Sequence, residues 1–154
     1  MIDAETVETL IKHLPPSAST LRLLDVGGNA GQALAERRAD VSVSVGMSAE
    51  TDSVDAVVAY DAAVDDALLA GLLDALRPGG RLIVIEPQGE ADGTRVKWLE
   101  AAGYTRILVE ELLSDAGVGV LMRGEKPHTT EDTLARVQSV AALDSGEFRG
   151  RYVH

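Results

Sequence analysis

The stretch from residue 21 to residue 31 constrains the fold more than any other part of the chain. Leu21–Val26 is a short, mostly apolar run, typical of a strand that is buried on both faces, and it carries the acid Asp25 near its end. A glycine-rich turn from Gly27 to Gly31 follows at once, and residues 30–39 have the spacing of a helix. This order places backbone N–H groups and a helix N-terminus above the carboxyl end of a strand, where nucleotide-like ligands bind.

The rest of the chain alternates between predicted strands and predicted helices. The predicted strands are residues 41–45, 54–60, 81–86, 104–112 and 118–123, and the predicted helices are residues 4–14, 65–76 and 94–102. A last helix is predicted from Thr129 or Thr130 to about Leu143. We therefore predict a mostly parallel α/β sheet with helices on both faces, closed by an antiparallel strand pair. The chain is expected to form one domain, residues 1–143, with a C-terminal tail, residues 144–154.

Composition excludes several classes of function. The formal charge of −11, from 25 acids and 14 bases, disfavours nucleic acid as a partner. The absence of cysteine excludes disulfides and thiolate sites, and His13, His128 and His154 show no metal-binding spacing and are expected to be surface groups. The sequence has no apolar run of about 20 residues, so no membrane span is expected. It also starts without the features of a signal peptide, so we expect a cytoplasmic protein.

Two segments together resemble a known family. The acid Asp25 followed by Gly27 and Gly31 is similar to motif I of the class I S-adenosylmethionine-dependent methyltransferases, with Asn29 in place of the middle glycine. The segment 76–87, in which Arg-Pro-Gly-Gly separates a helix from a strand ending in Glu86, resembles the approach to the fifth strand of that family. The resemblance implies a three-layer, Rossmann-like methyltransferase sandwich whose mostly parallel sheet ends in an antiparallel strand.

The resemblance also implies a cofactor, S-adenosylmethionine, and candidate site residues. The expected cofactor-binding residues are Asp25, Gly27, Gly28, Asn29, Gly31 and Met47. Asp61, which follows the strand 54–60, is the candidate catalytic base, and the alternative is that it caps the next helix. Glu86 ends a neighbouring strand and faces the same edge. Trp98 is expected to pack in the core.

The chain departs from the family between residues 41 and 54, where a strand and a helix are missing. In the family, an acid at the end of the second strand binds the ribose hydroxyls, and another after the third receives the adenine amino group. Here the strand 41–45 is followed by Gly46-Met47-Ser48, which contains no acid. Only Glu50 or Asp52, in the following loop, could reach back to a ribose. The segments 76–87 and 124–127 are also similar to the N-terminal domain of anamorsin-type proteins, a methyltransferase fold without a working cofactor site.

Two hypotheses of function follow. The first is a degenerate, non-catalytic scaffold or protein-interaction module, in which the glycines only permit a tight turn and close helix packing, and in which an exposed sheet edge invites a protein partner or self-association. The second is an S-adenosylmethionine-dependent methyltransferase acting on a small molecule. A nicotinamide dehydrogenase fits poorly, because the glycine spacing is wrong for it.

Overall fold

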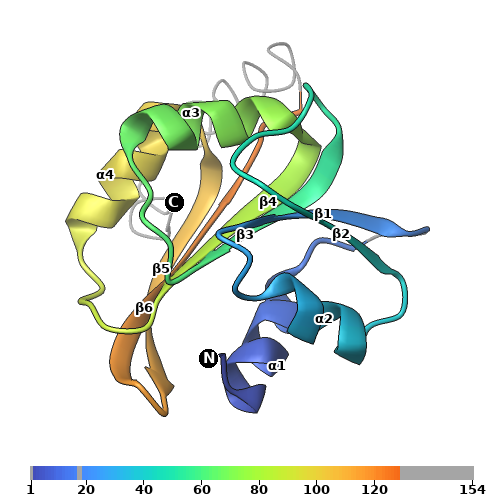
Figure 1. Cartoon of the computed structure of the whole chain (residues 1–154). Coiled ribbons are helices and arrows are strands. Elements are labelled where there is room, and N and C mark those ends of the chain that lie inside the picture. The colour runs from blue at the N-terminus through green and yellow to red at the C-terminus, as the bar shows by residue number, and fades with distance from the viewer. Residues whose placement is uncertain (1, 17–18, 129–154) are drawn as a thin grey trace, which may run out of the picture.

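The computed structural model describes residues 2–16 and 19–128, whose strands form one mixed sheet in the order β2-β1-β3-β4-β6-β5 (Figure 1). The strands are β1 (Leu21–Val26), β2 (Val41–Val45), β3 (Val54–Tyr60), β4 (Leu76–Glu86), β5 (Thr105–Ser114) and β6 (Gly117–Glu125). The helices are α1 (Ala4–His13), α2 (Gly31–Arg37), α3 (Asp66–Ala75) and α4 (Gly93–Ala102). Only β6 runs against its neighbours, β4 and β5, which confirms the predicted antiparallel closing pair.

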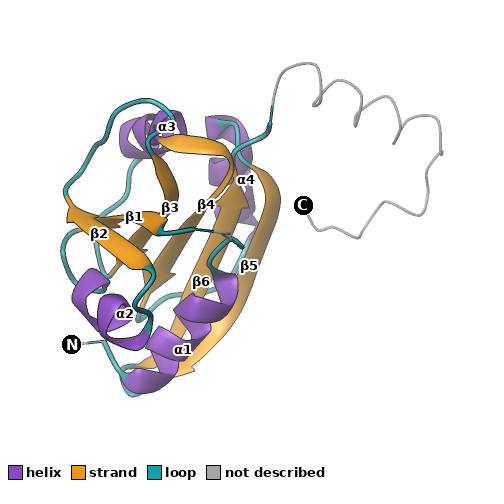
Figure 2. Ribbon diagram, turned by 90° about the vertical axis from the view of Figure 1, so that its right-hand side faces the viewer, coloured by secondary structure: helices purple, strands orange, loops and turns teal. Residues whose placement is uncertain are grey.

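Helices cover both faces of the sheet, as predicted (Figure 2). On one face, α1 and α2 bury Val7, Leu10 and Leu34 against the strands. On the other face, α3 and α4 bury a second set that includes Leu72 and Leu99. All seven residues of the central strand β3 are buried, which is the pattern of a strand covered on both sides. None of the helices in the described part of the chain is long and apolar enough to span a membrane.

Most of the predicted boundaries agree with the structure, and two do not. The strands predicted over 21–26, 41–45 and 54–60 have these bounds in the structure. The helix predicted over 30–39 ends at Arg37, because Arg38 adopts an extended conformation. The strand predicted to begin at Arg81 begins at Leu76, because Leu76 pairs with Val54 and the N–H of Gly79 donates to the Lys126 carbonyl at 2.8 Å. The predicted last helix and tail lie outside the described residues.

The connection between β2 and β3 is a loop, residues 46–53, without a helix. This loop returns to the start of β3 and packs Ala49 against the core on the α3 side of the sheet. Within the described residues β2 pairs with β1 alone and forms one edge of the sheet. Among the residues that the structure describes, the edge next to the glycine-rich turn is therefore open, at the place where the resemblance to the methyltransferases leads us to expect a further strand.

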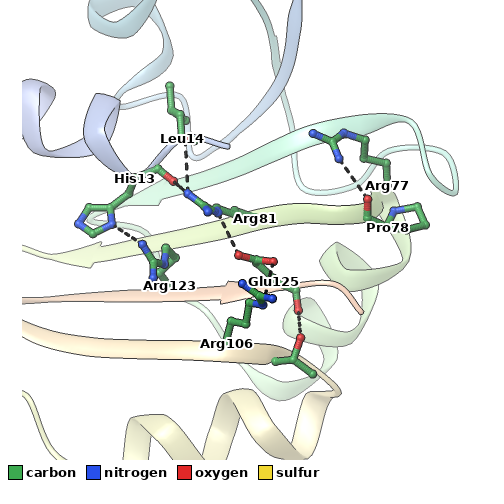
Figure 3. Close-up of polar contacts among 9 residues, drawn as sticks. His13, Leu14, Arg77, Pro78, Arg81, Arg106, Arg123 and Glu125 are labelled. Carbon is green, nitrogen blue, oxygen red and sulfur yellow. Dashed lines mark hydrogen bonds and ion pairs between the residues drawn. The ribbon is translucent and has the colours of Figure 1, made fainter. Parts of the chain in front are cut away.

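A cluster of charged side chains joins the end of α1 to β4, β5 and β6 (Figure 3). Arg123 Nη1 donates to His13 Nδ1 at 3.0 Å, so the His13 ring is neutral there and directs its Nε2–H toward Glu110 Oε1 at 3.5 Å. Arg81 donates to the His13 carbonyl at 3.1 Å and to Glu125 at 3.2 Å. The His13 side chain is only 14% exposed, so the prediction that it is a surface group is wrong.

This cluster makes stability depend on pH. Burial and the neighbouring Arg123 lower the pKa of His13 below its ordinary 6.5, although Glu110 opposes them. The unfolded chain therefore binds a proton more readily at this site than the folded chain, and stability is expected to fall as the pH drops below 6.5.

Urea unfolding of the wild type and of His13→Gln between about pH 7 and pH 5 measures this dependence. Glutamine keeps an acceptor for Arg123 and does not titrate. The variant should show a smaller loss of stability on acidification than the wild type. Equal losses in the two proteins would contradict the assignment to His13.

Candidate functional site

The candidate site is built on the buried carboxylate of Asp25 at the end of β1. This side chain is 1% exposed, and its Oδ2 accepts hydrogen bonds from the backbone N–H groups of Gly31 at 2.7 Å and Ala30 at 3.4 Å. Oδ1 is buried and has no hydrogen-bond partner among the described residues. Asp25 thus holds the start of α2 against the end of β1, and its observed bonds are internal to the turn.

The glycines of the turn have two different roles. Gly27 and Gly28 adopt left-handed backbone conformations, with φ of +90° and +74°, which side-chain-bearing residues rarely adopt. Gly31 has no such φ, but a Cβ there would lie 2.5 Å from Val43 Cγ1 and 2.8 Å from Asp25 Oδ2. Gly31 is therefore required for close packing of α2 against the sheet, which is the structural role that the sequence left open.

Asn29 bridges two neighbouring strand ends. Its side-chain Nδ2 donates to the backbone carbonyl of Tyr60, the last residue of β3, at 3.1 Å. The same Nδ2 lies 3.4 Å from the position that a Cβ on Gly27 would occupy, so the amide covers the turn. The positive φ angles of the turn fall on Gly27 and Gly28 and not on Asn29. The residue in place of the family's middle glycine therefore links the turn after β1 to the end of β3.

The end of β2 offers no acid to a ribose. Val45, the last residue of β2, is 69% exposed, and Met47 in the loop that follows is 56% exposed. The segment from Val41 to Ala49 contains no acid. Glu50 is exposed and lines a shallow groove with Ser44 and other residues of the β1–β2 face. Asp52 lies just before the amino end of β3, where Lys126 Nζ is 2.6 Å from its carboxylate.

Asp61 directly follows β3, Glu86 is the last residue of β4, and both line one hollow at this edge of the sheet. Asp61 is exposed, with φ of +52°, and its backbone N–H donates to the Ile85 carbonyl at 2.9 Å. The alternative that Asp61 caps the next helix is wrong, because Asp65 accepts the capping bond from Leu68 at 2.8 Å. Glu86 is held by Arg95 through two bonds, at 2.9 and 3.0 Å.

An apolar hollow of about 190 Å³ lies beside this edge, on the α4 side of the sheet. Its lining includes Val64, Val84 and Met122, with Trp98 and Glu86 at its border. The Arg95 guanidinium lies 5.8 Å from the centre of the Trp98 ring, and Trp98 is 44% exposed. The prediction of a core tryptophan is therefore wrong.

The structure brings the predicted residues of the turn together and adds neighbours that the sequence did not indicate. Asp25, Gly27, Gly28, Asn29 and Gly31 form one turn, flanked by Ala62 after β3 and Val45 at the end of β2. The Tyr60 carbonyl was missed, because a backbone acceptor leaves no signature in the sequence. The pairing of Glu86 with Arg95 was also missed, since the two residues lie on different elements.

Comparisons with known proteins place this geometry in a recognised fold. No protein-family model and no curated protein matches the sequence. A Haemonchus contortus phosphoethanolamine N-methyltransferase 2, solved with phosphomonomethylethanolamine and S-adenosylhomocysteine, has a TM-score of 0.60 at 14% identity, over 81% of this chain and 53% of that one. The chain thus spans about half the length of that enzyme.

Two further structures are matched over most of their own length. The Haloferax volcanii Trm112 methyltransferase activator in complex with a methyltransferase gives a TM-score of 0.55 at 17% identity, over 80% of this chain and 89% of that one. The cyclase SpnF gives 0.57 at 19% identity, over 81% of each chain. The TM-scores establish a shared architecture, whereas sequence identities this low do not establish a shared activity. The chain therefore has the Rossmann-like α/β fold of the S-adenosylmethionine-dependent methyltransferases.

Proposed function

We propose that this chain is a degenerate methyltransferase-like domain that acts as a non-catalytic scaffold or protein-interaction module. The observation that carries the proposal is the hydrogen bond from Asn29 Nδ2 to the Tyr60 carbonyl at 3.1 Å. It places a side chain of the protein itself across the turn, from the end of β1 to the end of β3. A ligand lying across this turn would first have to displace the amide.

The energetic argument has two parts. Breaking the Asn29 bond costs about 0.5–1.5 kcal/mol, because it is a neutral hydrogen bond. The absence of an acid at the end of β2 removes a charge-assisted bond of about 1.5–3 kcal/mol. Together these penalties of about 2–4.5 kcal/mol amount to a loss of roughly thirtyfold to two-thousandfold in cofactor affinity relative to a complete site.

Interaction with another protein is supported by the open sheet edge at β2. Edge strands present unpaired N–H and C=O groups that can bind a further strand. The comparison with the Haloferax complex shows that a protein with this fold can be solved together with a protein partner. The resemblance of segments 76–87 and 124–127 to anamorsin-type proteins also supports a domain without a working cofactor site.

The second candidate function is methyl transfer from S-adenosylmethionine to a small molecule, with Asp61 as base. It is favoured by the glycine-rich turn itself, in which Gly27 and Gly28 adopt positive φ angles directly after β1. Structures of similar fold contain S-adenosylhomocysteine or S-adenosylmethionine. For this chain, that function would require Asn29 to move away from the Tyr60 carbonyl.

Calorimetric titration with S-adenosylmethionine and S-adenosylhomocysteine separates the two candidates. The wild type is expected to give no binding heat at micromolar ligand. Asn29→Gly restores the family's glycine, and binding by this variant alone would identify the asparagine as the obstacle. Micromolar binding by the wild type would overturn the proposal, and Asp25→Ala would then test whether the ligand uses this turn.

A further inference from the structure

The outward edge of β2 presents a regular set of backbone groups. Leu21 N–H donates to the Asp40 carbonyl at 2.7 Å and Gly46 N–H donates to the Asp25 carbonyl at 3.2 Å, so even-numbered residues of this segment bond to β1. In a parallel pair, the alternate residues direct their N–H and C=O groups away from the neighbour. Val43 and Val45 therefore offer both groups to the outside, and within the described residues β2 pairs with β1 alone.

The sequence of β2 is complementary to itself. Val-Ser-Val-Ser-Val reads the same in both directions. In an antiparallel pair centred on Val43, valines lie opposite valines, and Ser42 lies opposite Ser44 of the other copy. Val43 would then exchange both of its outward hydrogen bonds with its own counterpart, as the centre of a two-fold antiparallel pair requires.

The edge also lacks the features by which proteins prevent such pairing. Edge strands are usually protected by charged side chains, proline or a bulge, and β2 has no charged residue and no proline. The chain carries a formal charge of −11, so two copies repel each other over most of their surface. β2 itself brings no charged side chain into such a contact, and Val45 is 69% exposed and Met47 56% exposed beside it.

We infer that β2 pairs antiparallel with β2 of a second copy of this chain, centred on Val43, and joins the two sheets into one. This inference rests on the proposed interaction role and names the partner for the open edge. Its failure can be distinguished from that of the proposed function, because cofactor binding and self-association are measured separately. A monomer that binds no cofactor would overturn only the pairing.

Cross-linking tests the register directly, because the natural chain contains no cysteine. Opposed residues of a non-hydrogen-bonded pair have Cα atoms about 4.5 Å apart, within the range that a disulfide bridges. Ser42 and Ser44 are both exposed. Under mild oxidation, a mixture of Ser42→Cys and Ser44→Cys proteins should form a disulfide-linked heterodimer, whereas either variant alone should cross-link poorly. Equal cross-linking in all three samples, or none in the mixture, would overturn the inferred pairing.

Analytical ultracentrifugation tests the association itself. The wild type should sediment as a dimer that dissociates on dilution, and Val45→Pro should be monomeric because proline removes an outward N–H that β1 does not use. Val45→Thr is the matched control, since it keeps the N–H and the β-branched shape, and it should dimerise. A monomeric wild type, or a dimer that survives Val45→Pro, would contradict the inference. If Val45→Pro fails to fold, the cross-linking of the serine variants still decides.

Discussion

Replacing Asp55 by alanine is expected to lower the free energy of unfolding by about 2–4 kcal/mol. The Asp55 carboxylate lies at the amino end of β3 with its side chain 8% exposed. It accepts hydrogen bonds from the backbone N–H of Arg22 at 2.7 Å, from the Arg22 guanidinium at 3.1 Å and from Arg77 Nε at 2.5 Å. One acid thus ties together the beginnings of β1, β3 and β4.

The size of this effect follows from what the substitution leaves behind. Without the carboxylate, a backbone N–H and two guanidinium groups lose their acceptor. The Arg22 and Arg77 side chains are 50% and 31% exposed, so water recovers part of the loss. For this reason we expect a cost below that of a fully buried broken ion pair. Urea unfolding gives the value directly.

The pH dependence provides a second measurement on the same group. Burial alone would raise the pKa of Asp55, but the hydrogen bonds from Arg22 and Arg77 outweigh it and lower the pKa to about 2. The ordinary pKa is 3.8, so the stability that the ionised Asp55 contributes is complete above pH 3.8. It is lost as the pH falls toward 2. The Asp55→Ala variant should therefore not show this part of the loss of stability on acidification.

Glu8→Ala is the matched control for Asp55. Glu8 forms an ion pair with Arg37 in which both side chains are about half exposed. Pairs of this kind contribute about 0–1 kcal/mol. If Asp55→Ala cost no more than Glu8→Ala, the assignment of Asp55 as the acid that joins the three strands would be wrong.

Replacing Gly31 by alanine is expected to destabilise the domain by about 2–3 kcal/mol. The added methyl group would lie 2.5 Å from Val43 Cγ1 and 2.8 Å from Asp25 Oδ2, closer than van der Waals contact permits. Relief requires α2 to move away from β2, which would lengthen the 2.7 Å bond from the Gly31 N–H to the Asp25 carboxylate. Overpacking and the weakened hydrogen bond therefore add together.

Gly71→Ala separates this steric effect from the general effect of removing a glycine. Gly71 lies within α3, and a Cβ there would have no atom within 4 Å. Alanine at such a position is expected to stabilise by about 0.5–1 kcal/mol. Thermal unfolding of both variants should therefore give shifts of opposite sign. A Gly31→Ala protein as stable as the wild type would show that the turn has more room than the structure indicates.

The sequence was sufficient to predict the sheet and the layers, because strongly apolar runs such as β1 and β3 can only be buried. It failed at Leu76–Gly80, where Pro78 and Gly79 indicated a break but hydrogen bonds to Lys126 keep the segment attached to the sheet. It also misjudged His13 and Trp98. His13 is buried beside Arg123, which tertiary structure brings close to it. Trp98 instead lies beside Arg95 of the same helix, at a border of the sheet that its helical position alone does not reveal.

The candidate site was predicted in part for a similar reason. The acid and the glycines of the turn have a recognisable spacing, and the structure places them together. The contact that determines our proposal joins Asn29 to a backbone carbonyl 31 residues away, and no pattern of side chains encodes it. The internal anchoring of Asp25 is likewise visible only when α2 is in place.

Nuclear magnetic resonance titration of the nitrogen-15-labelled chain with S-adenosylhomocysteine tests the central claim most directly, because it observes the turn itself and detects even millimolar binding. If Asn29 covers the turn of a non-catalytic domain, the backbone signals of Gly27 and Gly28 and the side-chain amide signals of Asn29 stay unchanged at micromolar ligand. Saturable shifts of these signals at micromolar ligand would contradict the claim and identify a working cofactor site.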